Sequence, residues 1–289
     1  MIVTHRPLSA ALACFSVLFV LFAPIAARAD APSVVVSVKP LHAIVAAVMK
    51  GVALPRLLVK GGASPHDYAM RPSDAAALRD AELIVWVGET FELFLVKSLA
   101  ALAGDAQVVS LMKLAGADED PHIWLDPDNA RKIAQRVAAA LSTLDPDNRD
   151  RYQDNTAAFS ARLDVLDAAL RSTLATVVDR PYVVYHDAYG AFERRYGLAR
   201  VAAITVNPQR QPGAKSIAAL RERIRETGAR CLFGEPQFSP ALLDTLVEDS
   251  TARIAVLDPL GATLRPGPEA YFTLMKNLAD SLRDCLEAD

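Results

Sequence analysis

The chain has few cysteines, few histidines and almost no net charge, and these shortages exclude several classes of protein. Its 289 residues include 3 cysteines and 5 histidines, and its formal net charge is -3 at pH 7. Without a basic excess the chain has no electrostatic footprint for nucleic acid, so no nucleic-acid partner is expected. It also lacks the Gly-x-x-x-x-Gly-Lys-Ser/Thr sequence that cradles nucleotide phosphates, so the chain itself is not expected to hydrolyse ATP.

One apolar run is nearly long enough to span a membrane, and it lies at the N-terminus. Arg6 precedes this run, which continues through Phe22, and an Ala-Arg-Ala sequence ends at Ala29. This order is typical of a secretory signal peptide comprising residues 1–29. An uncleaved membrane anchor is the alternative, but Pro24 and the small residues at the cleavage site favour removal. Cleavage would take away two basic residues and no acid, which changes the net charge from -3 to -5.

Only Cys231 and Cys285 remain after such cleavage, an even number in a chain that is expected to be exported. Cysteines of exported proteins tend to form disulfides, so we predict that these two pair. Two inert buried thiols are the alternative. A disulfide that closes this loop would contribute about 4 kcal/mol in the chain-entropy model.

The residues from Asn148 to Val177 contain no glycine or proline. Their large apolar residues recur at spacings of three, four and seven, which places them on one stripe of a helix. These residues are Tyr152, Phe159, Leu163, Leu166, Leu170 and Leu174. A helix of this length would extend about 45 Å. The sequence therefore predicts one long, stiff helix over residues 148–177 that joins two halves of the chain.

Short hydrophobic strands alternate with helical segments on both sides of this linking helix. The apolar runs 33–38 and 83–87 lie before it, and the run 182–185 lies after it. Such alternation is typical of mainly parallel sheets covered by helices on both faces. We therefore predict an α/β protein with two lobes, residues 30–147 and 178–289, joined by one rigid helix, with a ligand site in the cleft between the lobes.

Three histidines fall where such sheets bind ligands. Ligands of open α/β sheets bind beyond the carboxyl ends of the strands, and His66, His122 and His186 lie in loops or at strand ends there. Three convergent imidazoles suit Zn, Cu or Ni, and with one further position they form a tetrahedral zinc site. The alternative for each histidine is a hydrogen-bonded core or surface residue.

Asp258 is a candidate fourth ligand, although Asp before Pro at a strand end is more often a turn or helix cap. Weaker candidates are His42, Glu89 and Glu235.

The chain resembles the zinc-binding periplasmic components of ABC transporters, the metal-receptor cluster of solute-binding proteins. The resemblance covers nearly all of the chain after the signal peptide and rests on the sequences LLVKGGASPHDYAMRPSDAAAL, LIVWVGETFE, PHIWLDPDNA, VVYHDAYGAFERRYGL, TVNPQRQPGA, CLFGEPQF and VLDPLG, with a cysteine in the final helix. It implies that His66, His122 and His186 are the metal ligands and that Cys231 and Cys285 form the family's disulfide. Manganese-binding relatives typically carry a carboxylate where this chain has His186, so the third imidazole favours zinc.

The resemblance implies a receptor that captures Zn(II), as its transported ligand, in the periplasm and delivers it to an inner-membrane permease driven by an ATPase on other chains. We expect a monomer that is not an enzyme. A manganese receptor, a zinc-dependent hydrolase and a zinc chaperone for another exported protein are the alternatives. Two departures from the family pattern are that residues 115–120 form only a short acidic loop without histidine, and that Pro65 replaces an acid before His66. The fourth metal position is therefore left to Asp258 or water.

Overall fold

The computed structural model describes residues 1–2, 31–114, 120–205, 212–248 and 250–288. Contacts between residues divide the chain into Met1–Asp30 and Ala31–Asp289, and the fold below is that of the second unit. Residues 3–30, which contain nearly all of the predicted signal peptide, lie outside the described residues, as do residues 115–119 of the acidic loop. Within the part of the chain that is described, no helix is both long and apolar enough to cross a membrane.

The first lobe is built on a parallel four-stranded sheet in the order β2-β1-β3-β4. Its strands are β1 (Val34–Val36), β2 (Arg56–Leu57), β3 (Leu83–Trp86) and β4 (Gln107–Ser110). Its helices are α1 (Lys39–Val48), α2 (Pro72–Arg79), α3 (Leu93–Leu102), α4 (Pro127–Leu144) and the short turns η1 (Met112–Leu114) and η2 (Ile123–Leu125). Every residue of β1 and β3 is buried, as expected for a parallel sheet that is covered on both faces.

The second lobe repeats this architecture, with a parallel four-stranded sheet in the order β6-β5-β7-β8. Its strands are β5 (Tyr182–His186), β6 (Arg200–Thr205), β7 (Cys231–Gly234) and β8 (Arg253–Val256). Its helices are α6 (Gly190–Tyr196), α7 (Ala214–Thr227), α8 (Ala241–Val247) and α9 (Ala270–Glu287). The predicted α/β class with two mainly parallel sheets is confirmed.

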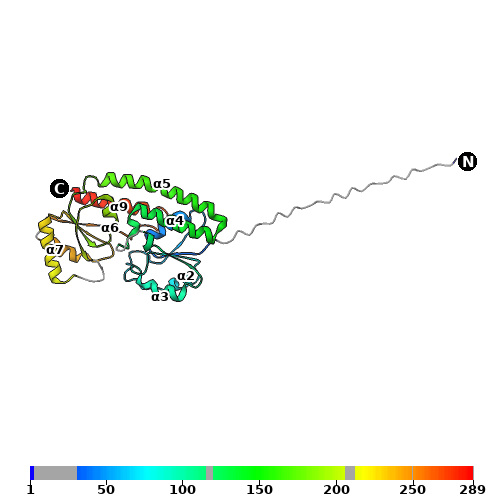
Figure 1. The fold of residues 1–289 in the computed structure, drawn as a ribbon, viewed down its shortest axis with the longest axis horizontal. Coiled ribbons are helices and arrows are strands. Elements are labelled where there is room, and N and C mark those ends of the chain that lie inside the picture. Colours follow the sequence, from blue (N-terminus) through cyan, green and yellow to red (C-terminus); the bar gives the residue numbers. More distant parts are fainter. Residues whose placement is uncertain (3–30, 115–119, 206–211, 249, 289) are drawn as a thin grey trace. The chain divides into compact units, whose positions relative to one another are not determined.

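The predicted long helix is α5, which runs from Arg149 to Leu174 after the short turn η3 (Pro146–Asn148). It ends three residues before Val177, the limit predicted from the sequence. All six apolar residues of the predicted stripe are buried. In Figure 1, α5 lies alongside α4 and α9, and it packs against both of them and against α1. Since α1 and α4 belong to the first lobe and α9 to the second, α5 is fixed to both.

One continuous cluster of buried apolar residues extends through both lobes and the helix between them. It includes Val36 of β1, Leu166 of α5 and Leu278 of α9. Each sheet also has a smaller cluster of buried apolar residues on its other face. In the first lobe this cluster lies beneath α2 and α3, and in the second it lies beneath α7 and α8. A core that both lobes share resists their separation, because moving one lobe away from the other would expose apolar surface.

Buried hydrogen bonds also tie the two lobes together. The ammonium Nζ of Lys39, in the first turn of α1, donates to the carbonyl oxygens of Gly261 and Ala262 at 2.6 Å each. The indole Nε1 of Trp124 donates to the carbonyl oxygen of Pro259 at 2.9 Å. The hydroxyl of Tyr271 donates back across the interface to the Trp124 carbonyl at 2.8 Å. The loop after β8 is thereby fixed against the first lobe.

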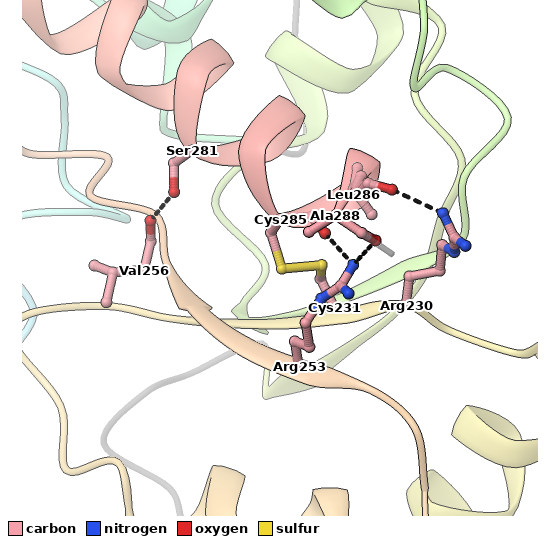
Figure 2. The surroundings of a disulfide bond; sticks show 8 residues. All are labelled: Arg230, Cys231, Arg253, Val256, Ser281, Cys285, Leu286 and Ala288. Carbon is pink, nitrogen blue, oxygen red and sulfur yellow. Dashed lines mark hydrogen bonds between the residues drawn. A yellow bond between two sulfur atoms is a disulfide. The ribbon is translucent and has the colours of Figure 1, made fainter.

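Figure 2 shows the disulfide between Cys231 of β7 and Cys285 of α9, which are 54 residues apart. Two arginines support the same end of α9. Arg253 donates to the carbonyl oxygens of Cys285 and Ala288, and Arg230 donates to the carbonyl oxygen of Leu286. The last carbonyls of a helix lack partners within the helix, so these guanidinium groups cap it. The C-terminal helix is therefore held to the second sheet covalently and by hydrogen bonds.

Candidate metal centre

The structure brings His66, His122 and His186 together. One ring nitrogen from each lies within 4.8 Å of the others. The ring centroids are 6.1 Å apart for His66 and His122, 5.1 Å for His66 and His186, and 4.9 Å for His122 and His186. His122 and His186 are buried, whereas His66 is partly exposed. Two imidazoles from the first lobe thus meet one from the second.

Each histidine lies in the segment that follows a strand or at the end of the strand itself. His66 is in the loop between β2 and α2, His122 immediately precedes η2, and His186 is the last residue of β5. The aromatic ring of Phe91 lies 4.9 Å from the His66 ring and 5.2 Å from the His122 ring, centroid to centroid. The Trp124 ring lies 5.3 Å from that of His122. These aromatic side chains fix the rotamers of the imidazoles and shield them from water.

Asp120 orients His122. Its Oδ1 atom lies 3.0 Å from Nδ1 of His122 and accepts a hydrogen bond from the His122 backbone N–H at 2.9 Å. Its Oδ2 atom accepts from the backbone N–H of Ala191, in the first turn of α6, at 3.1 Å. A proton on Nδ1 that faces a carboxylate leaves Nε2 of His122 with the lone pair that could bind a metal ion. Burial alone would raise the pKa of Asp120, but the hydrogen bonds from His122 and Ala191 hold it below its ordinary value.

Glu235 occupies a similar position behind His186. Its Oε1 atom lies 3.4 Å from Nδ1 of His186, and both side chains are buried. The hydroxyl of Tyr189 donates to the carbonyl oxygen of Leu257 at 3.1 Å. Burial, followed by the negative charge of Glu235, raises the pKa of Tyr189. Glu235 therefore lies on the Nδ1 side of the imidazole, near enough for an electrostatic interaction but without a hydrogen bond, and Nε2 of His186 lies on the other side of the ring.

Asp258, the candidate fourth ligand, has a different role. Its Oδ1 atom accepts from the backbone N–H of Leu260 at 3.1 Å and its Oδ2 atom from that of Ala262 at 2.6 Å. Among the described residues it does not join the three histidines as a possible ligand. The carboxylate stabilises the turn after β8. This is the role that the Asp-Pro sequence favoured over metal binding.

The two remaining candidates do not join the histidines either. His42 is buried within α1, where its Nε2 lies 3.0 Å from the carbonyl oxygen of Pro55. Burial lowers the pKa of His42. Glu89 is exposed in the loop after β3. Neither belongs to the group of possible metal ligands found in the described part of the chain.

The environment of the histidines favours uncharged imidazoles. Burial, followed by the nearby His186 and His122, lowers the pKa of His66 to about 3. Burial is also the main cause that lowers the pKa of His122, although Asp120 opposes it. A metal ion binds the neutral form of histidine. At neutral pH the ring nitrogens of His66 and His122 are therefore available without loss of a proton.

A cavity of about 330 Å³ opens onto the three histidines. We call it the histidine pocket; its other lining residues are Thr90, Asp120, Pro121, Asp187, Gly190, Arg194 and Arg200. Arg200 forms ion pairs with Asp187 and Glu193. The sequence pointed to the three histidines but not to Asp120, Arg194 or Arg200, which lie in the acidic loop, in α6 and in β6.

Two α/β lobes that share a core with one long helix, and that bring three imidazoles together in a pocket, define a metal-binding solute receptor. The sequence model of the family described as zinc-uptake complex component A, periplasmic (ZnuA) matches residues 34–285. This chain belongs to that family.

Relatives and solved structures agree with this assignment. The chain is 38% identical to the high-affinity zinc uptake system protein ZnuA of Brucella abortus (strain 2308), over 88% of this chain and 91% of the relative. It is 34% identical to the protein of the same name from Yersinia pestis, over 88% of this chain and 91% of the relative. A crystal structure of a ZnuA deletion mutant with zinc bound matches with a TM-score of 0.79 and 29% identity, covering 90% of this chain and 100% of that one. The periplasmic zinc-binding protein TroA of Treponema pallidum has the same fold, with a TM-score of 0.80 at 23% identity over 88% of this chain and 99% of that one.

Proposed function

We propose that this chain is the receptor of a high-affinity zinc uptake system, in which His66, His122 and His186 bind Zn(II). The receptor then delivers the ion to an ABC permease driven by an ATPase on other chains. The observation that carries this proposal is the convergence of three imidazoles, two from the first lobe and one from the second. Membership of a family of zinc-uptake components, whose relatives are named as zinc uptake proteins, supports the same cargo. The chain is a receptor and not an enzyme.

The ligand set favours zinc over manganese. Imidazole nitrogen suits Zn(II), whereas Mn(II) prefers carboxylate, carbonyl and water oxygen. The two carboxylates nearest the histidines, Asp120 and Glu235, face Nδ1 atoms of the imidazoles and not the space that the three nitrogens share. Because Glu235 faces Nδ1 of His186, it does not lie where the general base of a zinc hydrolase would be needed.

The proposal includes where the chain acts and how it is divided. We infer that residues 1–29 are a cleaved signal peptide and that the mature chain is a periplasmic monomer. The lobes comprise residues 30–147 and 178–289, with residues 148–177 as the link; the bounds of α5 are consistent with this division. Mass spectrometry of the exported protein tests the first point, because a mature chain that begins at Asp30 is expected and an intact N-terminus would contradict it.

Variants of the histidines test the proposed function. We expect wild-type protein, stripped of metal and then incubated with zinc, to retain one ion per chain, and His66→Ala, His122→Ala and His186→Ala to retain much less after the same dialysis. His42→Gln is the matched control, because it replaces a buried histidine outside the cluster. In cells lacking this gene, the wild type and the control should restore uptake of radioactive zinc under zinc limitation, and the three variants should not. Equal uptake with all variants would contradict the proposal.

A further inference from the structure

The three histidines leave the fourth position of a tetrahedral zinc ion to be filled from outside the protein. Zinc in a site with three protein ligands takes a fourth from water or another molecule. The described residues offer no fourth ligand that reaches the cluster. Asp120 and Glu235 face the Nδ1 atoms of His122 and His186, and Asp258 is bound to backbone N–H groups.

The histidine pocket is larger than a single water ligand requires. Its volume of about 330 Å³ compares with roughly 30 Å³ for a water molecule in the liquid. It falls at the lower end of the range of roughly 300–1,000 Å³ that is usual for pockets that bind small organic molecules. A ligand of several non-hydrogen atoms can therefore enter beside the metal ion.

Arg194 supplies a cation at this pocket that no other described residue neutralises within hydrogen-bond or ion-pair distance. It lines the histidine pocket from α6. A Cβ atom added to Gly190, which also lines the pocket, would lie 3.2 Å from Nη1 of Arg194 and 3.0 Å from Oδ2 of Asp120. The guanidinium group thus lies over the wall of the pocket beside Asp120. Its neighbours differ in this respect: Arg195 binds three aspartates and Arg200 binds Asp187 and Glu193.

The charges around the pocket oppose an anion until zinc is bound. Formally, Arg194 and Arg200 balance Asp120 and Asp187 among the lining residues. Two further carboxylates lie just outside the lining, Glu193 beside Arg200 and Glu235 behind His186, and Zn(II) offsets both of them. An anion is therefore repelled from the metal-free site. With zinc bound, the charges around the site balance, and an anion meets the metal ion and Arg194 directly, in a pocket partly removed from water where charge interactions are stronger than in bulk solvent.

We propose that the receptor binds zinc together with a small carboxylate anion, one oxygen of which is the fourth ligand of the metal while the other accepts a hydrogen bond from Arg194. This inference rests on the proposed function, since the anion binds to the metal that the histidines hold. Carboxylate oxygen is a regular ligand of zinc, and the guanidinium group is the side chain best suited to bind a carboxylate. The metal and the anion raise the affinity of the protein for each other by the same factor.

Cobalt-substituted protein tests the proposal, because Co(II) takes the place of zinc and its visible spectrum reports a change of ligand. Acetate, the probe, is titrated into the Co(II)-loaded full-length protein at constant ionic strength maintained with perchlorate. We expect a saturable spectral change in the wild type. In Arg194→Gln the half-saturating acetate concentration should rise about tenfold, which is typical for loss of a hydrogen bond between charged groups. Arg225→Gln, which removes an exposed arginine of α7 outside the pocket, is the matched control and should titrate as the wild type does.

A parallel titration of zinc affinity separates this inference from the proposed function. Acetate should increase the apparent affinity of the wild type for zinc, and the ratio of affinities with and without acetate should fall toward one in Arg194→Gln. Tight binding of zinc and cobalt with no saturable response to acetate would overturn the carboxylate proposal alone, and so would an equal response in Arg194→Gln. Absence of binding of either metal would overturn the proposed receptor and the carboxylate proposal with it.

Discussion

At the scale of single residues, the site is built from imidazoles and from the carboxylates that orient them. Asp120 contacts His122 through Oδ1 and Ala191 through Oδ2, so one side chain orients an imidazole of the first lobe and contacts the second lobe. Glu235 stands in the equivalent place behind His186. Groups of this kind set the tautomer of a metal-binding histidine and raise its basicity.

The first prediction concerns Asp120. Asp120→Asn keeps the size of the side chain but removes the negative charge that holds the proton on Nδ1 of His122. We expect the zinc affinity to fall about 10- to 100-fold, the usual cost of losing such a partner. Competition with a chromophoric chelator measures it, with Asp154→Asn, an exposed aspartate of α5, as the control. An affinity equal to that of the wild type would show that Asp120 does not orient the ligand.

The second prediction concerns pH. Burial, followed by His186 and His122, lowers the pKa of His66 from 6.5 to about 3. Between these values the unfolded chain binds a proton at this residue and the folded, metal-free chain does not, so the free energy of unfolding decreases as the pH falls from about 6.5 to about 3. The contribution of neutral His66 to the free energy of unfolding is fully present above pH 6.5. Each pKa unit corresponds to about 1.4 kcal/mol, so the full effect amounts to several kcal/mol.

We therefore expect the Tm of the metal-free protein to fall on acidification from about pH 7 to about pH 4. His66→Gln should show a shallower decline, because glutamine does not titrate. Calorimetric scans over this range measure both. The same pH dependence in His66→Gln and in the wild type would contradict the assignment of the effect to His66.

The residues of the site differ in how far the sequence reveals them. His186 ends β5, and His66 and His122 lie in the segments that follow β2 and β4. The topology of parallel sheets places ligands on this side, so the positions of the three histidines were predictable. Asp120 orients His122, two residues away, and also accepts a hydrogen bond from Ala191, 71 positions away. No local pattern encodes the contact with Ala191. The same holds for Arg194, which reads in the sequence as a charged residue on the surface of a helix. For Asp258 the sequence left a ligand and a turn open, and the structure shows the turn.

At the scale of elements, the long helix was the most predictable feature and the ends of elements the least. The buried stripe of α5 follows directly from the spacing of its apolar residues. Its end at Leu174 was not predicted because no glycine or proline marks it. At the start of α4 a local signal does exist, since Asp126 precedes Pro127 and accepts a hydrogen bond from the backbone N–H of Asp128. Helix ends are thus predictable where a capping side chain specifies them.

The third prediction concerns the disulfide between β7 and α9. Its 54-residue separation corresponds to about 4 kcal/mol of stabilisation in the chain-entropy model. We expect the double variant Cys231→Ala, Cys285→Ala to be less stable to urea by about this amount, while zinc still binds because neither cysteine belongs to the metal cluster. Reduced wild-type protein is the matched comparison and should behave as the double variant does. Equal urea midpoints for the oxidised wild type and the double variant would contradict the prediction.

At the scale of the whole molecule, the lobes are fixed to each other. They share an apolar core with α5, and Lys39, Trp124 and Tyr271 form buried hydrogen bonds across their interface. Opening the lobes widely would break these bonds and expose part of the core, at a cost of about 25 cal/mol for each Å² of apolar surface. Movements of the loops around the histidines require neither the loss of these hydrogen bonds nor exposure of the core.

The fourth prediction is that zinc binding changes the relative orientation of the lobes only slightly. Small-angle scattering of the metal-free and zinc-loaded protein should give the same radius of gyration within error, and hydrogen exchange should slow mainly in the loop that carries His66. A large decrease in the radius of gyration on zinc binding would indicate wide hinge closure. That result would contradict the prediction, because the shared core does not allow such a movement.

The most direct test of the central claim is a competition titration of metal-free protein with a chromophoric chelator, run with zinc and with manganese. Three imidazoles in one pocket predict one zinc ion per chain with a dissociation constant at or below about the nanomolar range, about -12 kcal/mol, and far weaker binding of manganese. Weak zinc binding, or a preference for manganese, would contradict the account, because it would mean that His66, His122 and His186 do not act together as the zinc site.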